Sequence, residues 1–517
     1  MRYLVFLFCL SAAPLSAAPR AALRLSAGLI ISSITIETHN VFETELPAEN
    51  KMIYRAANRI HYVTHEPIIM RELLFAVGDR YNAALVAETE RNLRALPFIR
   101  RAEAEATVNK SGTVEVLIRT YDSWTLELVA NYKRAGAATS IKAGLAESNI
   151  LGQGNSGSAI YNNDWGAASA DFAYKDRQFL NYKRLHYSVA AHASPVGRNI
   201  SLFFDRPFYA SIAPSAMSGS VSYTTVISTG AVTRQVAEAG VSYGIALARS
   251  TERTRRISLG LVAHRAESTG PLPDREQLLT MRLSAVWEEL DYLTVRRINK
   301  FTHDEDYNLG LGIFPSLAWA PAIRAFGTTQ TPLMPSIKVN KGFTWGNQLV
   351  FLNSGLSSRY FNGGNGNIVA SFSASYFLRG LRYQTLAFHT SLDLGWRLDP
   401  AAPLALGEFN GLRGYGVGQF TGSRRFLFNI EDRVYVWDNL FQLLDIGMVF
   451  FGDSGYVWPE SGPVKLADLK NSVGVGLRIA PSRSAGNSPV RIDLARALNG
   501  DYTRPDWSLS VLGGQAF

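Results

Sequence analysis

The chain has 517 residues, a formal net charge of +9 and one cysteine, Cys9. Its positive charges are scattered and not interleaved with stacking aromatic residues, which argues against a nucleic-acid-binding protein, and a lone cysteine excludes disulfide staples and thiolate metal sites. Apolar residues reach 47%, yet no run approaches the roughly 18 continuous apolar residues of a membrane helix.

Residues 1–18 have the pattern of a secretory signal peptide. Arg2 precedes an apolar stretch from Tyr3 to Leu10, and small residues follow up to Ala18. Because the apolar stretch is too short for a membrane anchor, we expect the segment to be removed on export. Cys9 is lost with it, which leaves a mature chain without cysteine.

Residues 30–122 predict one small α+β domain with the order strand, helix, helix, strand, strand, in which the helices cover one face of the sheet. The first strand is the alternating segment 34–37, and residues 101–108 and 114–118 form a hairpin around the turn 110–112. Asn82 is the expected N-cap of the second helix, and Pro97 marks its end. The predicted helix faces are Met52, Ala56, Ile60 and Val63 in the first helix, and Leu85, Thr89, Leu93 and Leu96 in the second.

From Trp124 onward helical periodicity disappears, and short alternating segments recur between turns rich in Gly, Asn and Asp. An open sheet of this length would expose its edges, whereas a closed barrel satisfies every backbone group internally. We therefore expect residues 123–517 to form a transmembrane antiparallel β-barrel. Strands of about 10 residues, with turns and some longer loops, give on the order of sixteen strands. Phe517, an aromatic residue on the last strand, suits an aromatic girdle at the membrane interface.

Several motifs resemble those of the outer-membrane protein assembly-factor superfamily, the bacterial surface antigen family that includes BamA and TamA. The resemblance covers essentially the whole mature chain. Residues 30–122 are similar to a POTRA (polypeptide-transport-associated) domain, through segments 69–75, 78–79, 93–98 and 121–125. In the barrel the matching segments are 149–154, 205–209, 412–415, 450–455 with 457–458, and 491–495. Only one POTRA-like unit is found here. Bacterial assembly factors of the family usually carry several such units, and its secretion pores usually carry two.

The resemblance implies a long loop that folds into the barrel lumen and carries the arginine motif of residues 411–416. Carried over to this chain, Arg413 would pair with Asp453 on the barrel wall, and Glu431 is a second acidic candidate. The physics agrees, because a guanidinium folded inward keeps its charge and suits bidentate pairing with a carboxylate. Glycines such as Gly414 let the loop turn where side chains have no room. The predicted lumen-loop latch is Arg413, Gly414, Tyr415, Asp453 and Glu431.

The family implies insertion or translocation of other proteins across the outer membrane, with the POTRA-like domain in the periplasm. The implied partners are unfolded or partly folded outer-membrane or secreted client proteins, the lipid bilayer and a candidate periplasmic accessory subunit. Unpaired strand edges can recruit client strands by β-augmentation. The client-binding candidates are therefore Arg101, Glu103 and Glu105 on an edge strand, and Trp124 and Phe517 at the barrel seam. Two alternatives stay open, a secretion pore for one dedicated exported protein and a passive outer-membrane channel.

Three short patterns suggest other chemistry. Residues 152–157 fit G-x-G-x-x-G, but the next segment continues as a strand where a dinucleotide site needs a helix. Residues 452–455 are similar to a protease nucleophile motif around Ser454, without recognisable His and Asp partners. Residues 303–306, His-Asp-Glu-Asp, offer hard oxygen ligands to a divalent cation, although such a run is more often a solvated turn. We expect no enzyme activity, no cofactor and no metal.

Overall fold

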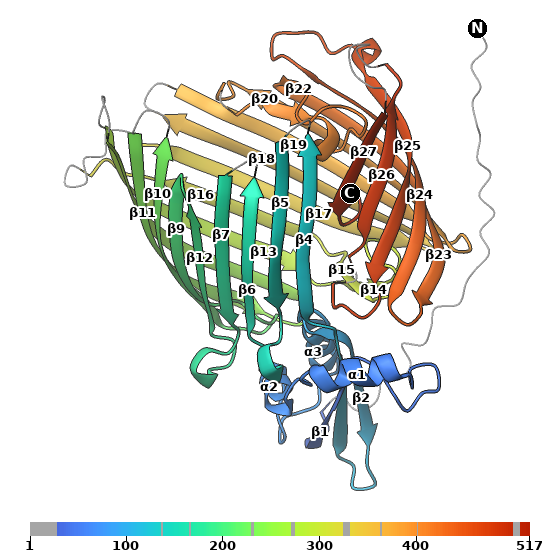
Figure 1. The fold of residues 1–517 in the computed structure, drawn as a ribbon. Coiled ribbons are helices and arrows are strands. Elements are labelled where there is room, and N and C mark those ends of the chain that lie inside the picture. The colour runs from blue at the N-terminus through green and yellow to red at the C-terminus, as the bar shows by residue number, and fades with distance from the viewer. Residues whose placement is uncertain are drawn as a thin grey trace.

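The computed structural model describes residues 28–135, 138–164, 167–228, 232–269, 274–323, 331–361, 364–400, 402–486, 488–499 and 507–517. The predicted signal peptide, residues 1–18, lies outside these ranges. An N-terminal α+β unit sits below a large β-barrel (Figure 1). Within the described ranges, no helix is both long and apolar enough to cross a membrane.

The N-terminal unit contains a three-stranded sheet and three helices. The sheet has the order β1-β3-β2, in which β1 (Ile31–His39) runs parallel to β3 (Val114–Asp122) and β2 (Ile99–Val108) runs antiparallel to it. The helices are α1 (Met52–Ile60), α2 (Glu66–Glu72) and α3 (Ala83–Arg94). The prediction of two helices is wrong, because α2 has only 7 residues and is too short to show a helical period in the sequence.

The core of the N-terminal unit lies between the sheet and the helices α2 and α3. Asn82 caps α3 as predicted, since its Oδ1 accepts a hydrogen bond from the main-chain N of Ala84 at 2.9 Å. The core combines Ile69 of α2 and Leu93 of α3 with Ile118 of β3, all fully buried. Two of the three helices therefore supply the apolar cover that the sheet needs.

Helix α1 does not cover the sheet, and this part of the prediction is wrong. Tyr54 is its buried residue, stacked on Phe42 with ring centroids 4.7 Å apart. Asn58 Nδ2 donates to the main-chain O of Phe42 at 2.8 Å and fixes the same side of the helix. The predicted apolar face therefore points outward, with Met52 and Ile60 exposed.

The barrel contains twenty antiparallel strands in sequence order, with β4 beside β27, and the prediction of sixteen strands is wrong. Its strands are β4 (Leu126–Ala135), β5 (Ala138–Glu147), β6 (Ser156–Asp164), β7 (Ala167–Asp176), β8 (His186–Ser194), β9 (Gly197–Arg206), β10 (Ser215–Ser228), β11 (Val232–Arg249), β12 (Arg253–Thr269), β13 (Asp274–Glu289), β16 (Gly312–Trp319), β17 (Leu333–Trp345), β18 (Gln348–Phe361), β19 (Gly364–Leu378), β20 (Gln384–Trp396), β23 (Arg424–Leu440), β24 (Leu444–Trp458), β25 (Lys470–Pro481), β26 (Val490–Ala497) and β27 (Trp507–Gly513). Several connections are much shorter than the estimate assumed. Only residues 195–196, for example, separate β8 from β9, so the same length holds more strands.

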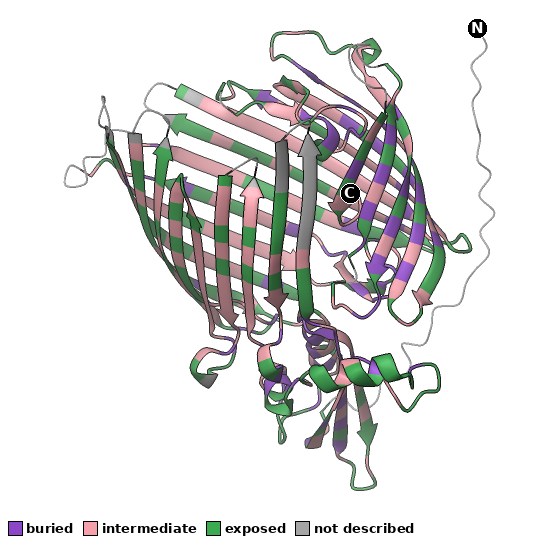
Figure 2. Ribbon diagram, viewed as in Figure 1, coloured by how far each residue is buried: buried purple, intermediate pink, exposed green. Residues whose placement is uncertain are grey.

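Burial alternates from residue to residue along strands such as β23 and β24 (Figure 2). Successive side chains of a strand point to opposite faces, so they lie in turn in the lumen and on the outer surface. On β23 and β24, Asn429 and Asp453 are buried in the lumen, whereas the neighbouring Phe428, Ile430 and Phe450 are exposed on the outside. An apolar outer face around a polar interior is typical of a membrane β-barrel.

Two segments fold from the strands into the barrel. The latch loop, residues 402–423, joins β20 to β23 and contains β21 (Leu404–Leu406) and β22 (Phe420–Gly422). The inserted hairpin, residues 290–311, joins β13 to β16 and contains β14 (Tyr292–Val295) and β15 (Glu305–Asn308). The latch loop comes from the barrel end far from the N-terminal unit, and the inserted hairpin comes from the near end (Figure 1).

Phe517 does not lie on the last strand, so its predicted place in an outer girdle is wrong. Strand β27 ends at Gly513, and Gly514, with φ of +82°, turns the chain inward. The Phe517 ring then stacks on His389 inside the barrel, with centroids 5.3 Å apart. The last residues of the sequence thus belong to the lumen.

Candidate functional site

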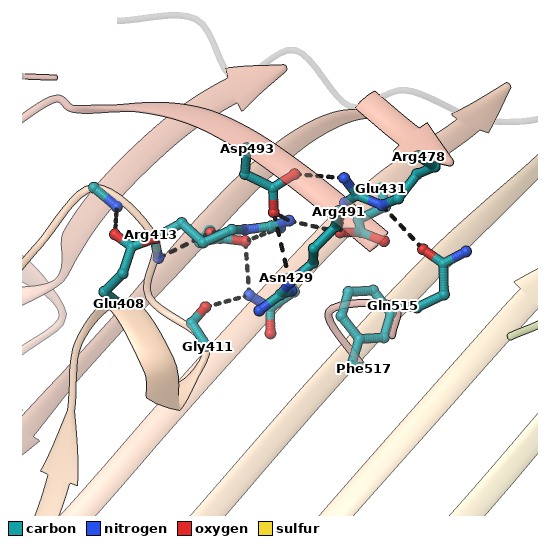
Figure 3. Close-up of polar contacts among 12 residues, drawn as sticks. Glu408, Gly411, Arg413, Asn429, Glu431, Arg478, Arg491, Asp493, Gln515 and Phe517 are labelled. Carbon is teal, nitrogen blue, oxygen red and sulfur yellow. Dashed lines mark hydrogen bonds and ion pairs between the residues drawn. The ribbon is translucent and has the colours of Figure 1, made fainter. Parts of the chain in front are cut away.

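Arg413 lies in the lumen and contacts both carboxylates that the sequence analysis assigned to it (Figure 3). Its Nε and Nη2 donate to Asp453 Oδ2 and Oδ1 at 2.8 and 2.7 Å, which makes a bidentate pair. Its Nη1 donates to Glu431 Oε1 at 2.7 Å. The guanidinium also lies 3.5 Å from the centroid of the Phe451 ring. Because Arg413 is only 1% exposed, solvent screens these charges little, and the planar fork fixes one position of the loop.

Arg413 is one of four arginines that share three carboxylates in this part of the lumen. The other arginines are Arg433, Arg478 and Arg491, and the carboxylates are Glu431, Asp453 and Asp493. Glu431 contacts three of the arginines at 2.7 to 3.8 Å, and Asp493 contacts three at 2.5 to 3.9 Å. Removing one member of such a buried network leaves charges uncompensated, which costs about 3–5 kcal/mol. The network can therefore hold the loop firmly only while it is complete.

Close packing holds the arginine motif against the wall. Gly411 has a φ of +100°, a conformation that other residues rarely adopt, and a Cβ there would lie 2.4 Å from Leu427 Cδ2, so the Leu427 side chain would have to move. Asn429 Nδ2 donates to the Gly411 carbonyl at 2.7 Å. Tyr415 Oη donates to the main-chain O of Asn471 at 2.8 Å, which ties the loop to β25.

Gly414 and Glu408 form a second attachment of the latch loop. Gly414 has a φ of +88°, and its main-chain N donates to Glu408 Oε2 at 2.8 Å. The same carboxylate oxygen accepts a hydrogen bond from Ser508 Oγ at 3.1 Å. Since Ser508 lies on β27, Glu408 links the motif to the last barrel strand.

Arg433 connects the network to the inserted hairpin. Its Nε donates to Glu431 Oε2 at 2.8 Å and its Nη1 to the Ile298 carbonyl at 2.6 Å. Its Nη2 donates to the main-chain O of Phe517 at 3.1 Å. One buried side chain thus contacts the wall, the hairpin from the near end and the inward-turned segment at the end of the sequence.

The acidic run of residues 303–306 lies in the inserted hairpin and is not a solvated turn. Glu305 is buried, and its carboxylate accepts a hydrogen bond from the Ile298 main-chain N at 2.9 Å. Asp306 accepts from Arg94 of α3 at 2.8 and 3.0 Å. Burial works to lower the pKa of Arg94, but Asp306 and Glu90 outweigh it and raise the pKa. The run therefore ties the hairpin to the N-terminal unit, and the described residues contain no side-chain group arranged to hold a metal.

Ion pairs and hydrogen bonds also dock the N-terminal unit onto the near-end turns of the barrel. Arg184, in the β7–β8 turn, donates from Nε to Glu72 Oε2 at 3.3 Å. Ser211, in the β9–β10 turn, donates from both its main-chain N and its Oγ to the Glu88 carboxylate at 2.6 Å. Because several turns contribute, the unit is held across the near end of the barrel.

A cavity of about 630 Å³ remains in the lumen beside the latch loop. Strands β17–β20 and β23 line it with polar side chains such as Asn353 and Asp393. Gly411 of the motif and Phe517 border the same space. The latch loop therefore covers part of the lumen wall and leaves a polar space next to it.

The structure separates the predicted client-binding candidates into two groups. Arg101, Glu103 and Glu105 lie on β2, which is an edge strand of the N-terminal sheet. Arg101 pairs with Glu103 at 3.0 Å, and Glu105 pairs with Arg119 at 3.1 Å. These pairs lie on a strand that stands at one end of the sheet order β1-β3-β2.

Trp124 and Phe517 do not meet at a seam. The main-chain N of Trp124 donates to the Arg483 carbonyl at 2.7 Å, at the turn between β25 and β26. Phe517 is turned into the lumen instead, as described above. The strand order places β4 beside β27, and neither Trp124 nor Phe517 is part of these two strands.

Several members of the network were not among the site residues predicted from the sequence. They are Glu408, Asn429, Arg433, Arg478, Arg491 and Asp493. The sequence contained a signal for some of these residues. Glu431 and Arg433 stand two residues apart on one strand, so their side chains share a face, and the same holds for Arg491 and Asp493. Charged side chains on the same face of a barrel strand belong in the lumen, since the other face meets lipid.

Comparison with known proteins gives structural likenesses only. No family model matches the chain, and no curated protein sequence matches it. BamA from Haemophilus ducreyi lacking POTRA domains 1–3 is similar at 12% identity and a TM-score of 0.37, over 94% of this chain and 84% of that chain. CdiB from Acinetobacter baumannii is similar at 10% identity and a TM-score of 0.41, over 94% and 73%. CdiB from Escherichia coli is similar at 11% identity and a TM-score of 0.45, over 96% and 92%.

Proposed function

We propose that this chain is an insertase or translocase of the outer-membrane assembly-factor superfamily. In this proposal the barrel spans the outer membrane and the N-terminal unit is a POTRA-like domain in the periplasm. The observation that carries it is the pairing of Arg413 with Asp453 and Glu431 inside the barrel. The sequence motifs of that superfamily imply the same contact between an inward loop and the barrel wall.

The occupied lumen favours this function over a passive channel. The latch loop enters from the far end, the inserted hairpin from the near end, and Arg433 contacts the hairpin while bonding to Glu431 of the latch network. A solute channel has no need for segments joined in this way. A protein-conducting barrel needs a stable resting state that a client can open, and a network of buried charges provides one.

Client capture requires no covalent chemistry. Strand β2 is an edge of the N-terminal sheet, and unpaired main-chain groups at an edge accept an added strand. The charged pairs of Arg101, Glu103 and Glu105 on β2 restrict indiscriminate pairing. An unfolded outer-membrane or secreted protein is the expected client, and a periplasmic accessory subunit is a further expected partner.

Depletion of the protein in its native host tests the proposal. For an assembly factor, the levels of several unrelated outer-membrane proteins should fall, measured by quantitative proteomics of the membrane fraction. Loss of one exported protein alone would identify a dedicated secretion pore instead. Unchanged levels of all exported and outer-membrane proteins would contradict the proposal.

A further inference from the structure

Helix α1 presents an apolar face that the fold does not bury. Met52, Ile53 and Ile60 are 80%, 63% and 68% exposed, whereas Tyr54, about 100° around the helix from Ile53, is 3% exposed. Ile53 and Ile60 stand seven residues apart, which places them on the same face of the helix, two turns from each other. The exposed residues thus form a continuous stripe along the helix.

A basic stripe runs beside the apolar one. Arg55 and Arg59 stand four residues apart on one side of α1, and both are exposed. Lys51 precedes the helix and is also exposed, and residues 51–60 contain no Asp or Glu. Apolar and basic stripes side by side are typical of a helix that lies in a membrane surface.

The position of α1 is at the near rim of the barrel. Tyr54 Oη donates to the main-chain O of Phe441 at 2.6 Å, and Phe441 lies in the turn between β23 and β24. A register shift on β23 places Trp437 opposite Ile446, on the outer face of the barrel. Exposed aromatic residues at the end of an outer face mark the level where lipid meets water. Figure 1 shows α1 lying across the strand direction, below the barrel.

We infer that α1 lies in the inner surface of the membrane that the barrel spans. Ile53 and Ile60 enter the boundary between headgroups and acyl chains, and Arg55 and Arg59 contact anionic phospholipid headgroups. This inference rests on the membrane-spanning barrel of the proposed function. Helix α1 contributes little to the core of the N-terminal unit. In this inference its role is to anchor that unit in the membrane beside the barrel wall.

Fluorescence quenching tests the inference on the chain without residues 1–18, which contains no cysteine, folded into vesicles of phosphatidylethanolamine and phosphatidylglycerol that carry doxyl-labelled lipid. Bimane is attached in separate variants, Ile53→Cys and Ile60→Cys. Val108→Cys is the matched control, because Val108 is an exposed apolar residue at the end of β2. Val475→Cys reports barrel insertion, because Val475 is exposed on the outer face of β25 and pairs with Phe450.

We expect quenching at positions 53 and 60 to be several-fold stronger than at position 108. Quenching at 475 together with no quenching at 53 would overturn the placement of α1 and leave the membrane barrel standing. In that case, protection of the label at 53 from an aqueous quencher would mean that residues 19–27 or a second copy of the chain cover the helix. No quenching at 475 would contradict the membrane-spanning barrel, and the placement of α1 with it.

A charge variant tests the role of the basic stripe. The double change Arg55→Glu and Arg59→Glu should reduce quenching at position 53 toward the level at 108 in the same anionic vesicles. Quenching at 475 should not change, since the barrel is intact. Unchanged quenching at 53 would overturn the proposed headgroup contacts.

Discussion

Two walls of this barrel differ in how far their polar lumen side chains are buried. On the covered wall, strands β23–β26, charged side chains are buried under the latch loop, and Glu431 contacts three arginines. On the open wall, strands β7–β12, polar side chains pair with the adjacent strand and stay accessible. Asp171 accepts from His192 at 2.6 Å, and both side chains are about two-fifths exposed. The contrast suggests that side-chain charges fix the covered wall, whereas the backbone ladder alone shapes the open wall.

Of the changes considered, Arg413→Ala should destabilise the covered wall most strongly. The change removes the bidentate partner of Asp453 and one partner of Glu431, both buried, and should destabilise the folded barrel by about 3–5 kcal/mol. Urea-induced unfolding in detergent micelles measures the loss. Arg413→Lys is the matched control, because lysine keeps the charge without the planar fork and should recover only part of the stability. A midpoint equal to the parent in both variants would show that the network does not hold the barrel.

Arg433→Ala should have the next largest effect. The Ile298 carbonyl loses its donor and Glu431 loses one arginine, and each unsatisfied buried group costs about 1–3 kcal/mol. The inserted hairpin should loosen while Arg413 stays paired. Limited proteolysis of the folded protein should therefore give a new cleavage between residues 290 and 311. An unchanged cleavage pattern would mean that other contacts hold the hairpin.

Asp306→Asn should separate the hairpin from the N-terminal unit at a smaller cost. The amide keeps the shape of the side chain but loses the charge that pairs with Arg94, and a hydrogen bond to a charged group contributes about 1.5–3 kcal/mol. Hydrogen exchange of α3 and of the hairpin should rise together, while exchange of β23 and β24 stays constant. A rise confined to one of the two segments would contradict the coupling.

Asp171→Ala on the open wall should have the smallest effect. An accessible contact of this kind contributes about 0–1 kcal/mol. The urea midpoint should therefore shift little. A loss as large as that of Arg413→Ala would remove the distinction between the two walls.

The sequence predicted those parts of the molecule that depend on local pattern. Alternation identified the hairpin of β2 and β3, and Asn82 marked the start of α3. The resemblance pointed to Arg413, Asp453 and Glu431, which the fold brings together. Each of these features leaves a signal in neighbouring residues or in a motif of fixed length.

Features that depend on distant contacts were not predictable in the same way. The apolar period of α1 was visible, but only the stacking of Tyr54 on Phe42 decides which side is buried. Strand number depends on loop lengths, which alternation alone does not define. Phe517 turns inward because of Gly514 and the ring of His389, a contact between residues more than a hundred positions apart.

A double-mutant cycle between Arg413 and Asp453 tests the central claim most directly. The free energy of unfolding in urea is measured for the parent, Arg413→Ala, Asp453→Ala and the double variant. If the two side chains hold the latch loop to the wall, the double variant should be less destabilised than the sum of the single changes, with a coupling of about 1–3 kcal/mol. Additive losses, within about 0.5 kcal/mol, would contradict the latch.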